Sequence, residues 1–259
     1  MTGGSTPRVT VLPACNASEW TGPSGTNTYL LHGAIATLID AGVGHPDHVA
    51  SIDRALAGCA LDRILITHAH PDHAGGIPAL LARWPRAQVR NAQGDACADG
   101  EPIAAGDGMV RAVYTPGHAV DHFCFVDERT RDLYCGDLAR AGGTIVIPAR
   151  AGGDLAAYLS SLRRVRDLAP RRLLPGHGPI VDDPAALLDA YLRHREAREA
   201  QVLDALAAGC STPARIAQRI YGDLTPALTR AADDSILAHL KKLESERRAA
   251  ERQDGWQLL

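Results

Sequence analysis

Short apolar runs that end at glycine, proline or polar clusters fill the first two-thirds of this chain. This pattern is typical of β-strands, which it predicts at residues 8–12, 27–31, 36–39, 63–66, 88–91, 110–115 and 172–174. A hairpin is predicted to join 122–126 to 132–135 through a turn at 127–130. Helical spacing separates the strands at 49–57, 78–83 and 154–168. Strands interleaved with helices indicate an α/β fold in which helices cover the sheets.

Helical periodicity dominates after Asp183. A long helix is predicted over 184–208, with a break near His194 left open. Thr212 followed by Pro213 is typical of a helix N-cap and first turn, opening a helix to Ile220, and a third helix follows over 233–246. Residues 248–259 are predicted to form a hairpin. We therefore predict an α/β domain over 1–183, then a helical linker and winged-helix-like domain over 184–259.

The composition is that of an ordinary globular protein, with 259 residues, 46% hydrophobic and 22% charged. A net charge of -3 gives no support for a sequence-independent grip on nucleic acid or on an anionic membrane. No apolar stretch reaches the roughly 20 residues that span a bilayer, and no secretory signal is expected at the N-terminus. Six cysteines without a Cys-x-x-Cys pair require no disulfide framework, so a cytoplasmic location is expected.

The densest chemical signal is a cluster of histidines directly after the apolar run 61–66. His68, His70, Asp72 and His73 fall within six residues. Imidazole and carboxylate groups are ligands that zinc accepts, and a buried strand that ends among them is typical of a metal site. The following Gly75 and Gly76 allow a tight turn into the next helix.

Three further polar residues each follow a glycine at the end of an apolar segment. They are His118 in Thr-Pro-Gly-His, Asp137 in Cys-Gly-Asp and His177 in Pro-Gly-His-Gly. Glycine at these places allows close backbone approach and an unusual φ. A single such pair is common in loops, but its recurrence together with the histidine cluster indicates one shared site.

These residues resemble the pattern of the metallo-β-lactamase superfamily, which is His-x-His-x-Asp-His followed by a distant His, an Asp and a last His. The resemblance implies an αββα sandwich with two divalent metal ions, zinc by first choice, at one edge between the sheets. Manganese and iron accept the same ligands. The metal ligands that it implies are His68, His70 and His118 for one ion, Asp72, His73 and His177 for the other, and Asp137 as the bridge.

The chemistry expected of such a pair is hydrolysis by a shared hydroxide formed near neutral pH, which attacks an electrophilic carbonyl or phosphorus. Asp137, as the bridge, and Asp72, which would also orient the nucleophile, are the predicted catalytic residues. Asp40 in Leu-Ile-Asp-Ala-Gly matches an early aspartate of the family that orients a ligand histidine. A turn residue that merely ends the strand is an equal alternative for Asp40.

Departures from the family pattern narrow the range of activities that the resemblance implies. Asp137 stands where zinc β-lactamases with a cysteine ligand have that cysteine, and Cys135 is assigned to core packing. A complete second metal site disfavours the one-iron persulfide dioxygenases. Residues 25–30 and 174–180, with Tyr191, His194 and Arg195, resemble the lactamase-beta-2-like branch, whose members carry a C-terminal winged helix. Members include an RNA-cleaving endonuclease and polyketide-processing thioesterases.

Three functions follow from this resemblance. Hydrolysis of a small ester, thioester or lactone is preferred, and metal-dependent cleavage of single-stranded RNA is the alternative. The third, nucleic-acid binding by the C-terminal domain, is disfavoured because residues 194–259 hold ten Lys and Arg against ten Asp and Glu. That domain is expected to roof the site or to form a homodimer, without a membrane partner. His45 and His48 are expected in a solvated loop, and His122 is an open candidate for the pocket.

Overall fold

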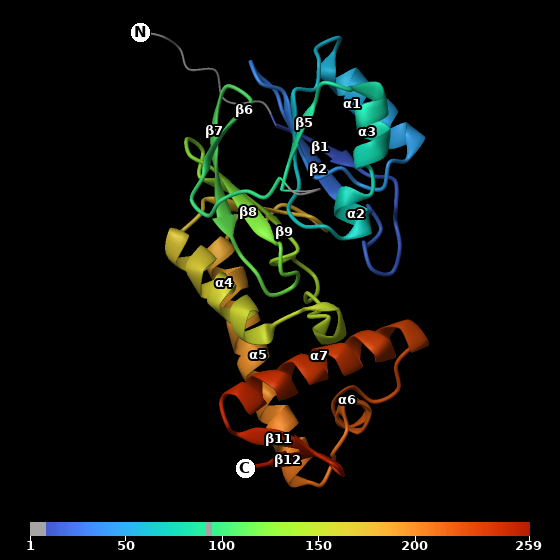
Figure 1. Ribbon diagram of the computed structural model, residues 1–259, viewed down its shortest axis with the longest axis vertical. Helices are drawn as coiled ribbons and strands as arrows, with labels where there is room; N and C mark the ends of the chain where they lie inside the picture. Colours follow the sequence, from blue (N-terminus) through green and yellow to red (C-terminus); the bar gives the residue numbers. More distant parts are fainter. Residues whose placement is uncertain (1–8, 92–94) are drawn as a thin grey trace. The chain divides into compact units, whose positions relative to one another are not determined.

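The computed structural model describes residues 9–91 and 95–259, so Arg8 of the predicted first strand lies outside the described part. The chain divides into two compact units (Figure 1). The first comprises Met1–Tyr114, Asp121–Gly143 and Ala169–Pro184, and the second Thr115–Val120, Thr144–Leu168 and Ala185–Leu259. Both units are therefore built from segments far apart in the sequence.

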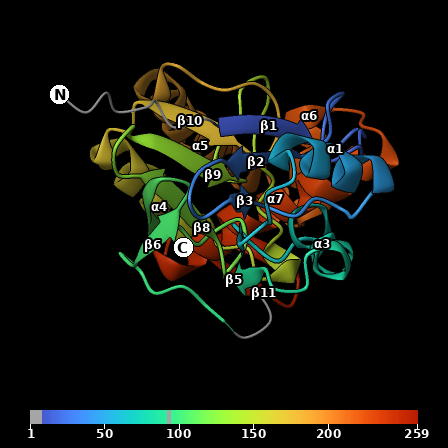
Figure 2. The same cartoon turned by 90° about the horizontal axis from the view of Figure 1, so that it is seen from above.

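Two five-stranded sheets form the first unit (Figure 2). One has the order β1-β2-β3-β4-β5, and its strands are β1 (Val9–Pro13), β2 (Asn27–Leu31), β3 (Thr37–Ile39), β4 (Arg63–Leu65) and β5 (Gln88–Arg90). The other has the order β10-β9-β8-β7-β6, with β6 (Pro102–Ala105), β7 (Gly108–Tyr114), β8 (Phe123–Asp127), β9 (Asp132–Gly136) and β10 (Arg172–Pro175). Predicted ligands come after the ends of β4, β9 and β10. Each of these strands takes part in a parallel pair.

Apolar side chains cover both faces of the first sheet. On one face Leu38 and Ile64 pack with the helices α1 (Pro46–Leu56) and α3 (Ile77–Arg83). On the other face Ile39 and Leu65 pack against residues of the second sheet such as Phe125. Burial on both faces explains why these strands have continuous apolar runs rather than strict alternation. The rigid sheets thus fix the positions at which their strands end.

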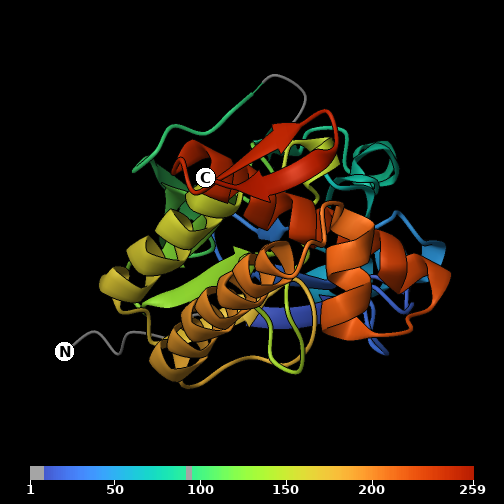
Figure 3. The same cartoon turned by 90° about the horizontal axis from the view of Figure 1, so that it is seen from below.

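Helices and one hairpin make up the second unit (Figure 3). The helices are η1 (Ala149–Ala151), α4 (Leu155–Leu168), α5 (Pro184–Ala207), α6 (Pro213–Tyr221) and α7 (Pro226–Ser245), and β11 (Ala249–Arg252) pairs with β12 (Gly255–Leu258). Val202, Ile216, Ile236 and Trp256 share one core. The hydroxyl of Thr212 accepts a hydrogen bond from the backbone of Arg215, so the predicted N-cap of α6 is confirmed.

Most predicted elements are present, with informative differences. α5 runs unbroken through His194. α7 begins seven residues before the predicted start, because Thr225 caps it and Pro226 fits its first turn. The short helix α2 (Pro71–Ala74) and strand β6 were not predicted. Within the described residues, no helix combines the length and apolar character that crossing a membrane would require.

Candidate metal centre

The seven predicted ligands follow the ends of strands. His68 lies three residues after β4, Asp137 directly follows β9, and His177 comes two residues after β10. Among the described residues, three groups of side chains each bring ligand atoms within 4.8 Å of one another. The groups are His68 with His70 and His118, His68 with His73 and Asp137, and Asp72 with His73 and His177. The structure therefore brings all seven residues into converging sets.

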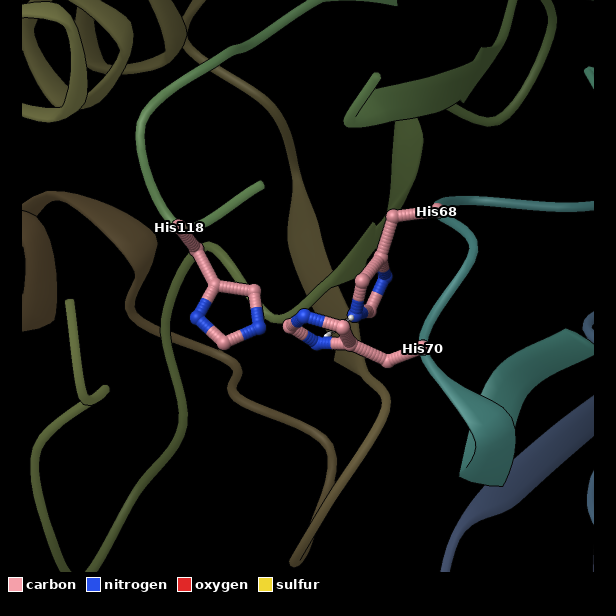
Figure 4. Close-up of side chains that lie close together, drawn as sticks. All are labelled: His68, His70 and His118. Carbon is pink, nitrogen blue, oxygen red and sulfur yellow. Dashed lines mark hydrogen bonds between the residues drawn. The ribbon is translucent and has the colours of Figure 1, made fainter. Parts of the chain in front are cut away.

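The first group consists of imidazoles alone (Figure 4). His68 is fully buried, and its Nε2 lies 3.0 Å from Nδ1 of His70. Nδ1 of His118 donates a hydrogen bond of 2.8 Å to the carbonyl of Val146, which leaves Nε2 of His118 as the atom that could bind a metal ion.

The other two groups join imidazoles to carboxylates. Nε2 of His177 lies 3.2 Å from Oδ2 of Asp72 and 3.4 Å from Oδ1 of Asp137. Nε2 of His73 lies 3.6 Å from Asp72 and 3.4 Å from Asp137 through the same oxygens. Asp137 thus faces His73 and His177 and also forms a set with His68, which belongs to the first group.

Charge interactions within this cluster oppose the effect of burial. Burial lowers the pKa of His177, but hydrogen bonds to Asp137 and Asp72 outweigh it and raise that pKa to about 9. Burial likewise opposes the charged form of His73, yet the carboxylates of Asp40 and Asp137 raise its pKa. The carboxylates thus favour the protonated imidazoles, and a bound metal ion would replace those protons.

Asp40 is both a strand-ending residue and a partner of a ligand histidine. It follows β3 with a φ of 62°. Its carboxylate accepts a hydrogen bond of 2.7 Å from Nδ1 of His73 and another of 2.7 Å from the backbone N–H of Thr67. These contacts fix the histidine tautomer and tie the ligand loop to the end of β3.

The residues present fit a divalent metal. With Nδ1 of His73 bonded to Asp40, its buried Nε2 has no hydrogen-bond partner among the described residues and faces the carboxylates of Asp72 and Asp137. Once it has lost its proton, an imidazole nitrogen held among carboxylate oxygens is a ligand that zinc and related ions accept.

Several residues beside the ligands were not predicted or were left open. His122 is fully buried, and its Nε2 accepts the backbone N–H of Asp137 at 3.2 Å. Asp121 accepts the N–H of Ala69 at 2.9 Å, between two ligand histidines. The amide of Asn91 donates to the carbonyls of Ile66 and Asp121. The Asp121-His122 pair was visible in the sequence, whereas nothing in the pattern singled out Asn91.

The expectation for His48 was wrong. It is fully buried in α1, and its Nε2 lies 2.8 Å from the hydroxyl of Thr28. Burial lowers its pKa to about 4, so it is a neutral core residue rather than part of a solvated loop. His45 is partly exposed at the start of the same helix, where its Nδ1 accepts the N–H of Asp47.

Glycine is required before the ligands because neighbouring atoms leave no room for a Cβ or because the backbone has a positive φ. A Cβ on Gly176 would lie 2.5 Å from Cε1 of His73, and one on Gly117 would lie 2.3 Å from Cα of Tyr158. Gly117 and Gly136 have φ values of 140° and 46°. Cys135 is fully buried, with Sγ 3.5 Å from the carbonyl of Ala139, which agrees with its assignment to packing.

Comparison with known families now identifies the class. Residues 21–96 and 99–177 match the metallo-beta-lactamase superfamily, and residues 212–256 match the beta-lactamase associated winged helix domain. The chain belongs to the metallo-β-lactamase superfamily and combines its mixed α/β fold with a C-terminal winged-helix domain.

Relatives and solved structures agree with this membership. The chain is 35% identical to the lactamase-like protein vrtG of Penicillium aethiopicum, over 93% of this chain and 83% of the relative. It is 34% identical to the atrochrysone carboxyl ACP thioesterase of Aspergillus chevalieri, over 95% and 83%. A beta-lactamase domain protein from Burkholderia ambifaria has a TM-score of 0.81 at 21% identity, over 98% of this chain and 91% of that structure, which shows a shared fold.

We expect Asp40→Asn to weaken metal binding by about 10- to 100-fold, since this is the usual effect of losing a partner that orients a ligand histidine. Asparagine has the shape of aspartate and tolerates a positive φ, so the strand end is kept while the charge facing His73 is lost. Titration of the metal-free variant with zinc against a competing chelator measures the change. Asp62→Asn is a matched control, because Asp62 accepts the N–H of Ala36 at the opposite end of β3. Equal zinc affinity in Asp40→Asn and the wild type would contradict the orienting role.

Proposed function

We propose that this protein is a dinuclear-metal hydrolase that cleaves the thioester bond of a small acyl substrate. The observation that carries the proposal is the position of Asp137, whose carboxylate forms a ligand set with His68 and lies 3.4 Å from His73 and His177. A carboxylate shared in this way would bridge two metal ions. Ester and lactone substrates have the same electrophilic carbonyl and belong to the same proposal.

The proposed ligand set is His68, His70 and His118 for one ion, Asp72, His73 and His177 for the other, with Asp137 between them. When bound, such ions, zinc by first choice, lower the pKa of water toward neutrality and polarise a carbonyl oxygen. Asp40 and the Val146 carbonyl hold the ring orientations of His73 and His118. Asp72 is partly exposed and would accept a hydrogen bond from the attacking water and so orient it.

The choice of a thioester rests on chemistry and on relatives. A relative at 34% identity is named an acyl carrier protein thioesterase, and the alignment covers nearly all of this chain. Residues 194–259 carry as many acidic as basic side chains, so this segment has no net positive charge to attract RNA. We therefore place hydrolysis of a small molecule ahead of RNA cleavage. We also propose that the protein is located in the cytoplasm.

A substrate panel tests the proposal. The zinc-loaded protein is assayed with an S-acyl pantetheine, the oxygen ester of the same acyl group, an aryl lactone and a single-stranded RNA, and the metal content of the protein is measured as purified and after loading. We expect hydrolysis of the thioester with about two zinc ions per chain. Cleavage of RNA alone, lost in Asp137→Ala, would favour the nuclease, and one iron per chain would overturn the dinuclear centre.

A further inference from the structure

One segment of the second unit contacts a proposed metal ligand through its backbone. Residues 144–151 include Val146, whose carbonyl accepts the Nδ1–H of His118 at 2.8 Å. This bond selects the tautomer with a free lone pair on Nε2 and fixes the direction in which that lone pair points. The position of the Val146 carbonyl therefore determines the orientation of the His118 imidazole.

A buried arginine from helix α5 holds this segment. Arg195 is only 3% exposed, and its Nη2 donates hydrogen bonds to the carbonyl of Ile145 and, at 3.2 Å, to the hydroxyl of Thr144. Burying a guanidinium is costly unless its donors find acceptors, and Nη2 of Arg195 finds both of its acceptors in this segment. Ile145 is the residue directly before Val146.

The same arginine also contacts the helix that supports the backbone of His118. The guanidinium carbon of Arg195 lies 5.3 Å from the ring centroid of Tyr158 in α4. The backbone of Tyr158 packs so closely on Gly117 that no Cβ fits there, and the N–H of Asp154 donates to the Gly117 carbonyl at 2.8 Å. α4 thus fixes the main chain before His118, while Val146 fixes its imidazole.

We propose that Arg195 is a positioning residue for His118. One role of the C-terminal helices is then to orient a metal ligand. Arg195 contacts both supports of that histidine, the segment 144–151 and helix α4. The proposal rests on the proposed function, because it takes His118 as a ligand. It also gives a role to Arg195 within the Tyr191, His194 and Arg195 motif, in which Tyr191 and Arg195 are buried and His194 is exposed.

Arg195→Lys tests the proposal, with Arg198→Lys as the matched control. Lysine keeps the charge of Arg195 but cannot make both hydrogen bonds and the stacking contact together. Arg198 lies one turn away on α5, and its guanidinium carbon is 4.1 Å from the ring centroid of Tyr221. The measurements are cobalt titration of metal-free protein against a chelator, the cobalt absorption spectrum, the melting temperature of the metal-free form, and kcat and KM.

For Arg195→Lys we expect an about 10- to 100-fold weaker affinity for one of two cobalt ions, a changed absorption spectrum and a lower kcat with KM unchanged. Arg198→Lys should keep both affinities and the spectrum. Thr144→Val removes only the contact with the Thr144 hydroxyl and should change the same affinity in the same direction by a few-fold. This second variant decides the matter if Arg195→Lys does not fold.

Two results would overturn the positioning role alone. One is wild-type affinity for both ions in Arg195→Lys and in Thr144→Val. The other is a lower melting temperature of metal-free Arg195→Lys with unchanged cobalt affinity and spectrum, which would make Arg195 a stabilising residue only. Failure of the wild type itself to bind two ions would instead overturn the proposed function and, with it, the inference.

Discussion

Asp137→Ala is expected to lower kcat/KM for the thioester by about a thousandfold. Metal ions stabilise the developing charge of a hydrolytic transition state by several kcal/mol, and about 4 kcal/mol corresponds to a factor of a thousand in rate. Asp137 forms a set with His68 and His73, and its Oδ1 lies 3.4 Å from Nε2 of His177. Its loss therefore removes a ligand from both proposed ions. Steady-state kinetics and metal analysis of the purified variant measure the effect.

Asp132→Ala is the control for this variant. Asp132 is a buried aspartate at the opposite end of the same strand, β9, where it pairs with Arg171 and Arg172. We expect Asp132→Ala to lower the melting temperature while metal content and kcat stay near those of the wild type. If Asp137→Ala keeps two metal ions and more than a tenth of the wild-type kcat/KM, Asp137 is not the bridge.

The sequence sufficed to predict the strands that lead to the site, for a physical reason. Strands such as β4 are buried on both faces, so their apolar runs are nearly continuous and end sharply at polar residues. The ligand residues also have distinct chemistry, and histidines at such ends are rare without a function. A pattern of this kind needs no knowledge of tertiary contacts.

Contacts made through the backbone could not be predicted in this way. The carbonyl of Val146 acts on His118 regardless of the Val146 side chain, and Asn91 acts through carbonyls of residues distant in sequence. Arg195 stood out in the sequence only as part of the family resemblance, and its burial and its contacts became visible only in the fold. β6 was missed because Pro-Ile-Ala-Ala has weak strand propensity and is held by its pairing with β7.

Removal of the metal ions with a chelator is expected to abolish hydrolysis and to lower the melting temperature by about 10 °C. A ligand present at about a thousand times its Kd stabilises the folded state by about 4 kcal/mol, and each kcal/mol corresponds to roughly 2–4 °C for a chain of this size. The effect is expected because the fold brings Asp72, Asp137 and the histidines together, so that a metal ion would bind the folded chain much more tightly than the unfolded one.

Two equivalents of zinc should restore both activity and the melting temperature, whereas calcium, which prefers six to eight oxygen ligands, should restore neither. This contrast follows from the donor set, in which five of the seven proposed ligands are imidazoles. Differential scanning calorimetry and thioester hydrolysis on the same samples measure the two recoveries. Full recovery with one equivalent of zinc would point to a mononuclear centre, because Asp137 would then have no second ion to bridge. Unchanged hydrolysis by protein shown to be free of metal would remove the basis for the proposed mechanism, in which the metal ions would lower the pKa of the attacking water.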